Sequence, residues 1–118
     1  MKKIVLAIAL ATTSIIGFSQ DFMQIITIES VVSAGAGRSR MLIDKGDGTV
    51  EEVKMKNFFS LVGINFSNIQ ENNKAISTKI SELAKQGWNL QFVTPGTYNH
   101  AGELGGGIFI TRYLFKKE

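Results

Sequence analysis

The chain has 118 residues, with 13 Lys and Arg, 10 Asp and Glu, one histidine and no cysteine. Without cysteine it can use neither disulfides, thiol chemistry nor cysteine-ligated metal. The net charge is +3, but the basic residues do not gather into the kind of face that nucleic acid binding requires, beyond the pairs Arg38/Arg40 and Lys116/Lys117. We therefore expect no nucleic acid partner.

The first 19 residues have the layout of a secretory signal peptide. Lys2 and Lys3 give a positive start, residues 4–18 are mostly apolar, and Ser19 suits cleavage before Gln20. The apolar stretch is shorter than the ~20 residues that cross a membrane. We expect an exported protein, periplasmic or extracellular, with no transmembrane span after cleavage. The mature chain would be a single domain, residues 20–118, with 11 basic and 10 acidic residues once the two lysines are removed.

Three strands are predicted in the first part of the mature chain. Residues 22–33 are rich in Ile, Val and Thr, which favour strands, and residues 38–44 and 49–55 continue this composition. Ala-Gly-Ala-Gly at 34–37 predicts a turn between the first two strands. Lys-Gly-Asp-Gly at 45–48 predicts a hairpin, because Asp-Gly suits a type I′ turn.

The next segment, residues 56–68, is apolar but follows neither a strand period nor a helix period. We expect an ordered connection that lies over an edge of the core. A short added strand and a helical turn are the alternatives.

The clearest element is an amphipathic helix that begins near Ser67. Ser67 and Gln70 have the spacing of a capping box, and Lys85 followed by Gly87 indicates the end of the helix. The apolar residues that recur at helical spacing on one stripe are Ile69, Ile76, Ile80, Leu83 and Ala84.

Two further strands are expected after the helix. Alternation places Trp88, Leu90 and Phe92 on one face, packed under the helix, with the tryptophan as a core anchor at the junction. Pro95 and the glycine after it predict the end of this strand. Residues 108–115 are apolar on both faces, which predicts a central strand or one covered twice.

The C-terminal half of the chain resembles a known family. Leu-Ala-Lys-Gln-Gly-Trp-Asn-Leu at 83–90 and Arg-Tyr-Leu-Phe-Lys-Lys at 112–117 are similar to small bacterial domains of unknown function with a Leu-x-x-x-Gly-Trp-Glu-Leu pattern and a closing Tyr-x-Phe-Lys-Arg strand. The likeness covers residues 69–117. It departs at Asn89, where the family has glutamate, and at Lys117, where it has arginine. The resemblance implies a sheet-plus-helix fold and no particular activity, cofactor or catalytic residue.

Together the elements predict an α+β fold, an antiparallel sheet of about five strands with one main amphipathic helix packed on one face. One helix covers only one face of a sheet. The other face must therefore be covered by residues 58–66, be covered by a second subunit, or be polar. A homo-oligomer would follow from the second arrangement.

No pattern predicts a metal or phosphate site. Residues 44–52 have Gly46 and Gly48 where a calcium loop needs oxygen ligands. The glycine-rich runs 34–38 and 101–109 precede strands, whereas phosphate loops precede a helix N-terminus. One histidine cannot build a multi-histidine metal site. We expect no metal and no cofactor.

The candidate binding residues lie in two glycine-containing loops. The segment 94–107 is long for a hairpin connection, and such loops are often functional. Arg38 and Arg40 flank the other glycine turn and suit an acidic group. The residues of the longer loop that suit polar contacts are Tyr98, Asn99, His100 and Glu103.

These features favour a non-enzymatic binding or protein-interaction module, whose partner is an unidentified protein or small ligand. No cluster of acid, base, nucleophile or metal-ligating residues stands out in the sequence. The alternative is a small hydrolase-like enzyme in which His100 acts as a general base with a nearby carboxylate, Glu103 or Asp44. A pocket that places His100 against either carboxylate would favour the enzyme.

Overall fold

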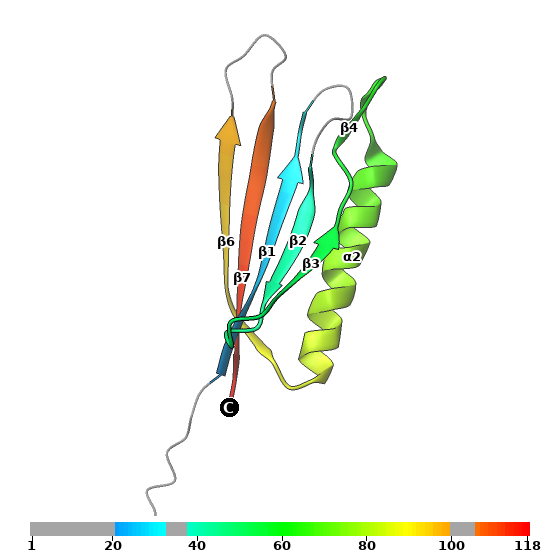
Figure 1. Ribbon diagram of the computed structural model, residues 1–118. Coiled ribbons are helices and arrows are strands. Elements are labelled where there is room, and N and C mark those ends of the chain that lie inside the picture. Colours follow the sequence, from blue (N-terminus) through cyan, green and yellow to red (C-terminus); the bar gives the residue numbers. More distant parts are fainter. Residues whose placement is uncertain (1–20, 33–37, 100–105) are drawn as a thin grey trace, which may run out of the picture.

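The computed structural model describes residues 21–32, 38–99 and 106–118 (Figure 1). These residues form an antiparallel sheet in the order β3-β2-β1-β7-β6, the helix α2, and a small second sheet of β4 and β5. The predicted α+β class is confirmed. The predicted signal peptide and the glycine turn at 34–37 lie outside the described residues. Among those described, no helix is long and apolar enough to cross a membrane.

The first three strands lie where the sequence predicts them. β1 (Asp21–Ser30) is the middle strand of the sheet, with β2 (Arg40–Asp44) on one side and β7 on the other. β3 (Val50–Lys54) forms one edge, in agreement with its polar sequence. Along β1 every second side chain from Met23 to Thr27 is buried. This alternation is typical of a strand with one covered face.

The turn between β2 and β3 is longer than predicted. The Lys45 amide donates to the Thr49 carbonyl oxygen at 3.1 Å, which leaves three residues in the loop. Gly46 has a φ of 73°, and a Cβ at this position would collide with the carbonyl oxygen of Phe22. The hairpin is confirmed, but the two-residue type I′ turn is not formed.

The connection to the helix contains two short strands. β4 (Phe59–Ser60) and β5 (Gly63–Ile64) pair as a small hairpin beside α2 (Figure 1). Of the predicted alternatives, the added short strand is the one present. The Asn57 side chain fixes the chain just before this hairpin, since its Nδ2 donates to the carbonyl oxygens of Val32 and Phe59 at 2.7 and 2.8 Å.

The helix begins slightly earlier than predicted. The N-cap of α2 (Phe66–Lys85) is Asn65, whose Oδ1 accepts a hydrogen bond from the Asn68 amide at 3.0 Å. The predicted capping box is wrong, because Ser67 lies inside the helix. The predicted end is confirmed, since Gly87 follows the helix with a φ of 90°.

The helix packs on the face of the sheet formed by β1, β2, β3 and one end of β7. Of the predicted apolar stripe, Ile76 is buried and Ile80 packs against the core, whereas Ala84 is exposed. Asn72, a polar residue of the same helix, is only 2% exposed. The main core cluster consists of Met23, Ile25, Met41, Ile43, Leu83 and Phe115.

The last two strands, β6 (Asn89–Asn99) and β7 (Gly107–Lys117), form a long hairpin. β7 is central, between β1 and β6, as predicted. In β6, a bulge separates Leu90 from Phe92, so that Leu90 is opposite the core residue Phe115 whereas Phe92 lies on the other face. The prediction that these two side chains share a face is therefore wrong.

Pro95 does not end the strand, because β6 continues to Asn99. The hairpin loop is therefore shorter than the predicted segment 94–107. Trp88 stands just before β6, half-buried against the core, and Lys117 Nζ lies 5.6 Å from its ring centroid. The tryptophan thus anchors the helix–sheet junction, as predicted, and the closing strand adds a cation–π contact.

Candidate functional site

The helix covers only one of the two faces of the sheet. Because side chains alternate along a strand, the sequence neighbours of buried Ile25 and Phe115 point away from α2. We call this second face the open face, since no helix or strand of the described residues lies on it (Figure 1). Residues 58–66 do not cover it. Phe58 packs on the helix side, with its ring centroid 6.1 Å from that of Phe109.

The open face is apolar over four neighbouring strands, so the polar face, one of the three predicted alternatives, is not the one present. Across β2, β1, β7 and β6 the side chains form a continuous group, which we call the apolar patch. Its most exposed members, Phe92 and Tyr98, are 68% and 61% exposed. The apolar patch consists of Ile26, Ile28, Leu42, Phe92, Tyr98, Ile108, Ile110 and Leu114.

One charged side chain stands in the middle of the apolar patch. Arg112 is the middle residue of β7, is exposed, and lies opposite Ile26 on β1 and Thr94 on β6. It takes part in none of the ion pairs formed within the described ranges. Sequence analysis missed this residue, because its central place on a face appears only when the strands are in register.

β6 is the edge strand beside the apolar patch and is exposed along its whole length. It carries no charged residue, although exposed edge strands often carry charges that prevent pairing with another chain. Here Pro95 removes one backbone donor and the bulge between Leu90 and Phe92 interrupts the regular edge. A partner protein can therefore pack on the apolar face of the sheet, whereas backbone pairing with the edge strand β6 is hindered.

Two of the predicted binding residues line a pocket at the end of the β6–β7 hairpin. Tyr98 and Asn99, together with the start of β7, border a pocket of about 380 Å³. Tyr98 belongs to the apolar patch as well. His100 and Glu103, predicted from the same segment, lie outside the described residues.

The two predicted arginines do not join this pocket. Arg40 begins β2 on the open face, and its guanidinium forms an ion pair with Glu52 Oε1 at 3.0 Å. The acidic group predicted to bind Arg40 is therefore a carboxylate of the chain itself. Arg38 is exposed just before β2. β1 and β7 separate β2 from β6, a distance of about 14 Å at the usual strand spacing. The two groups of predicted binding residues thus lie apart.

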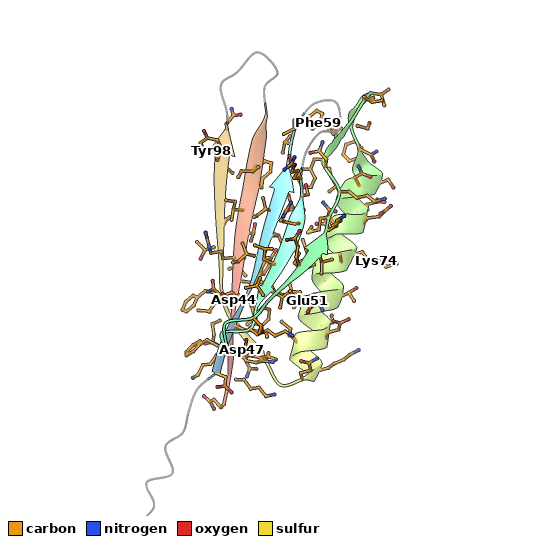
Figure 2. All side chains as sticks on the ribbon, viewed as in Figure 1. Asp44, Asp47, Glu51, Phe59, Lys74 and Tyr98 are labelled. Atoms are coloured by element: carbon orange, nitrogen blue, oxygen red, sulfur yellow. The ribbon has the colours of Figure 1, made fainter. Side chains whose placement is uncertain are left out.

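Asp44, considered as a partner for His100, lies at the opposite end of the sheet from Tyr98 (Figure 2). Its Oδ1 accepts a hydrogen bond from the Gly46 amide at 3.0 Å, as aspartates in turns commonly do. Within the ranges the structure describes, no three His, Cys, Asp or Glu residues are grouped so that they could hold a metal ion.

A polar cluster on the helix side was also missed by sequence analysis. Asn72 Oδ1 accepts from the Lys56 amide at 2.8 Å, and its Nδ2 donates to the Lys56 carbonyl oxygen at 2.7 Å. Burial raises the pKa of Glu29 above its ordinary value, and the neighbouring amide side chain of Asn72 opposes this by less. Burial, together with the charge of Glu29, also raises the pKa of Tyr113. Asn72 stands four residues before the apolar Ile76, and this helical spacing was the sequence signal that could have placed Asn72 on the buried side of the helix.

Comparisons of the chain with models of known protein families, with curated proteins and with solved structures found no match. The resemblance of residues 69–117 to the Gly-Trp-Glu-Leu family stays a prediction.

Proposed function

We propose that the protein is an exported, non-enzymatic interaction module that binds another protein through the apolar patch. Export is supported by the signal-peptide layout of residues 1–19. Protein binding is supported above all by one observation, a continuous apolar patch on the face of the sheet opposite α2. Exposed apolar patches with polar surroundings are typical of protein-binding surfaces.

The size of the apolar patch indicates how strong the interaction is. Four strands about 4.8 Å apart and about seven residues of about 3.4 Å cover about 450 Å². The largest patch of a typical monomer is about 300–600 Å² and is often functional. A partner that covered only this area would bury about 900 Å² in total, below the roughly 1,200 Å² of stable complexes. The proposed binding is therefore weak and transient.

The hydrolase-like alternative draws no support from the described residues. Of the two carboxylates considered for His100, Glu103 lies outside them, and Asp44 lies at the far end of the sheet from Tyr98 and is engaged in its own turn. The pKa of Glu29 is raised, but Glu29 lies on the helix side, away from the apolar patch.

Site-specific photo-crosslinking in the cells that produce the protein tests the proposal, because covalent capture suits a transient complex. Phe92 is replaced by p-benzoylphenylalanine, which keeps an exposed aromatic group on the apolar patch. The matched control places the same group at Phe66, an aromatic that is 71% exposed at the start of α2. Mass spectrometry of each product also reports the N-terminus of the mature chain, expected at Gln20.

The proposal expects one discrete protein cross-linked at position 92, and not at position 66, to a chain that begins at Gln20. Cross-linking at position 66 alone would move the interface to the helix side and overturn the proposal. An uncleaved N-terminus would overturn the exported location. Absence of any cross-linked protein at position 92 would remove the binding function of the apolar patch.

A further inference from the structure

We infer that the protein bound by the apolar patch presents a carboxylate to Arg112, and that this partner is not a second copy of the chain. The inference rests on the proposed function and adds the chemistry of the partner. It follows from the charge of Arg112, its central place and the residues that surround it.

The surroundings of Arg112 on the open face contain no acidic group. Along β7 its neighbours are Ile110 and Leu114, and across the strands they are Ile26 and Thr94. The diagonal neighbours on β1 and β6 are Gln24, Ile28, Phe92 and Gly96. Arg112 therefore stands alone among apolar and uncharged polar side chains.

The acidic groups that the open face does carry are distant or engaged. Glu52 is on β3, three strands from β7, which is about 14 Å at the usual spacing. It is also paired with Arg40 at 3.0 Å. Asp44 is two strands away on β2 and accepts a hydrogen bond from its own turn. A carboxylate for Arg112 must therefore come from outside the described residues.

Covering the apolar patch makes this carboxylate necessary. A partner that packs on Ile26, Ile110 and Leu114 also removes water from the guanidinium between them. Burying an unpaired charge is costly, whereas an Arg–carboxylate pair with two parallel hydrogen bonds restores the lost interactions and fixes the orientation of the partner. Central, desolvated arginines are among the residues on which binding depends most.

The same charge disfavours a second copy. In a two-fold dimer each surface patch meets its own equivalent. Pairing of two apolar patches centred on Arg112 would bring two guanidinium groups together in an apolar interface, where like charges repel strongly. Arg112 thus acts against self-association and in favour of an acidic partner.

A charge-swap experiment tests whether Arg112 favours an acidic partner over a second copy of the chain. The Arg112→Glu variant presents the same apolar patch with a carboxylate at its centre, so it stands in for the acidic partner. Sedimentation equilibrium at several hundred micromolar compares wild type alone, Arg112→Glu alone, and their equimolar mixture. Arg112→Asp serves as a second acidic variant, and circular dichroism checks that each variant is folded.

We expect the mixture to associate at least about tenfold more tightly than either chain alone, since close charge pairs at interfaces contribute this much or more. Raising the salt concentration should weaken the association in the mixture. If wild type alone self-associates as tightly as the mixture, the occupant is a second copy and the inference is wrong. If the mixture behaves as the sum of its components, the charge at position 112 selects nothing and the inference is also wrong.

This result is independent of the cross-linking at Phe92. Cross-linking of a partner at position 92, together with no charge selection at position 112, would leave the proposed function standing and remove the inference. Failure of the cross-linking would remove the proposed function itself.

Discussion

Adjacent residues of β7 show how differently the two faces of the sheet are used. Phe115 points toward α2 and is 1% exposed, in a cluster with side chains from β1, β2 and the helix. Leu114, one residue earlier, points to the open face, on which no helix or strand of the described residues lies. The same strand therefore contributes to folding with one face and leaves the other face available for recognition.

The two ends of the sheet differ in the same way. β1 and β2 supply most of the core, and β3 adds Val53 beside it. β6 at the other end contributes no residue to the core cluster and is exposed along its whole length. In Figure 1, α2 lies beside β3, at the opposite side of the sheet from β6. The helix-covered end stabilises the fold, and the β6–β7 end extends the apolar patch.

The largest expected effect on stability comes from Phe115, the core residue of this pair. Phe115→Ala should lower the free energy of unfolding by about 3–5 kcal/mol, because it removes a fully buried aromatic ring and leaves a cavity. Leu114→Ala should lower it by only about 1 kcal/mol, since this side chain has neighbours on the open face alone. Urea unfolding followed by circular dichroism measures both.

In a binding assay with the cross-linked partner, the order of the two effects should reverse: among proteins that are still folded, Leu114→Ala should bind more weakly than Phe115→Ala. Leu114→Ala should weaken binding, because it removes part of the apolar patch. A loss of stability for Leu114→Ala as large as that for Phe115→Ala would mean that a layer covers the open face, and the distinction between the faces would fail.

A smaller effect is expected from Asn72, the polar group buried under the helix. Asn72→Ala leaves the amide and carbonyl groups of Lys56 without their side-chain partners, which should cost about 2 kcal/mol of unfolding free energy. Asn73→Ala is the matched control, because its side chain is exposed on the same helix. Equal effects of the two substitutions would show that the Asn72 hydrogen bonds do not hold the connection before β4.

Much of the fold could be predicted from the sequence because it follows from local patterns. The helix stripe around Ile76 and Leu83, the glycine that ends the helix, and the apolar run of β7 all depend on residues close together in the chain. The cap was misplaced because Asn65 and Ser67 are both good cap residues, and only the path of the preceding hairpin decides between them.

The candidate site was harder to predict, because it depends on register between distant strands. A single-residue bulge after Leu90 moved Phe92 to the open face, and no sequence pattern marks that bulge. Arg112 looks like an ordinary strand residue until β1 and β6 are placed beside it. Tyr98 was identified from its loop-like sequence, although it lies in a strand, because Pro95 reads as a strand end when the strand is not known to be an edge.

The smallest effect concerns Glu29, the carboxyl group half-buried on the helix side. Burial raises its pKa in the folded protein above the ordinary value of 4.5, so the folded protein holds this proton more tightly than the unfolded chain does. The contribution to stability is therefore present below pH 4.5 and is lost as the pH rises through the folded-state pKa. Glu29→Gln removes the charge and should be more stable than wild type at neutral pH, with the difference shrinking as the pH falls toward 4.

Urea unfolding at a series of pH values between 4 and 8 measures this difference. Glu52→Gln is the control from the open face. It loses only a surface ion pair with Arg40, so its unfolding free energy should stay within about 1 kcal/mol of wild type throughout. A stability difference between Glu29→Gln and wild type that did not change with pH would mean that Glu29 keeps the same proton affinity in the folded and unfolded chain. The covered face would then tolerate a charge as the open face does, and the contrast between the two faces would be one of packing alone.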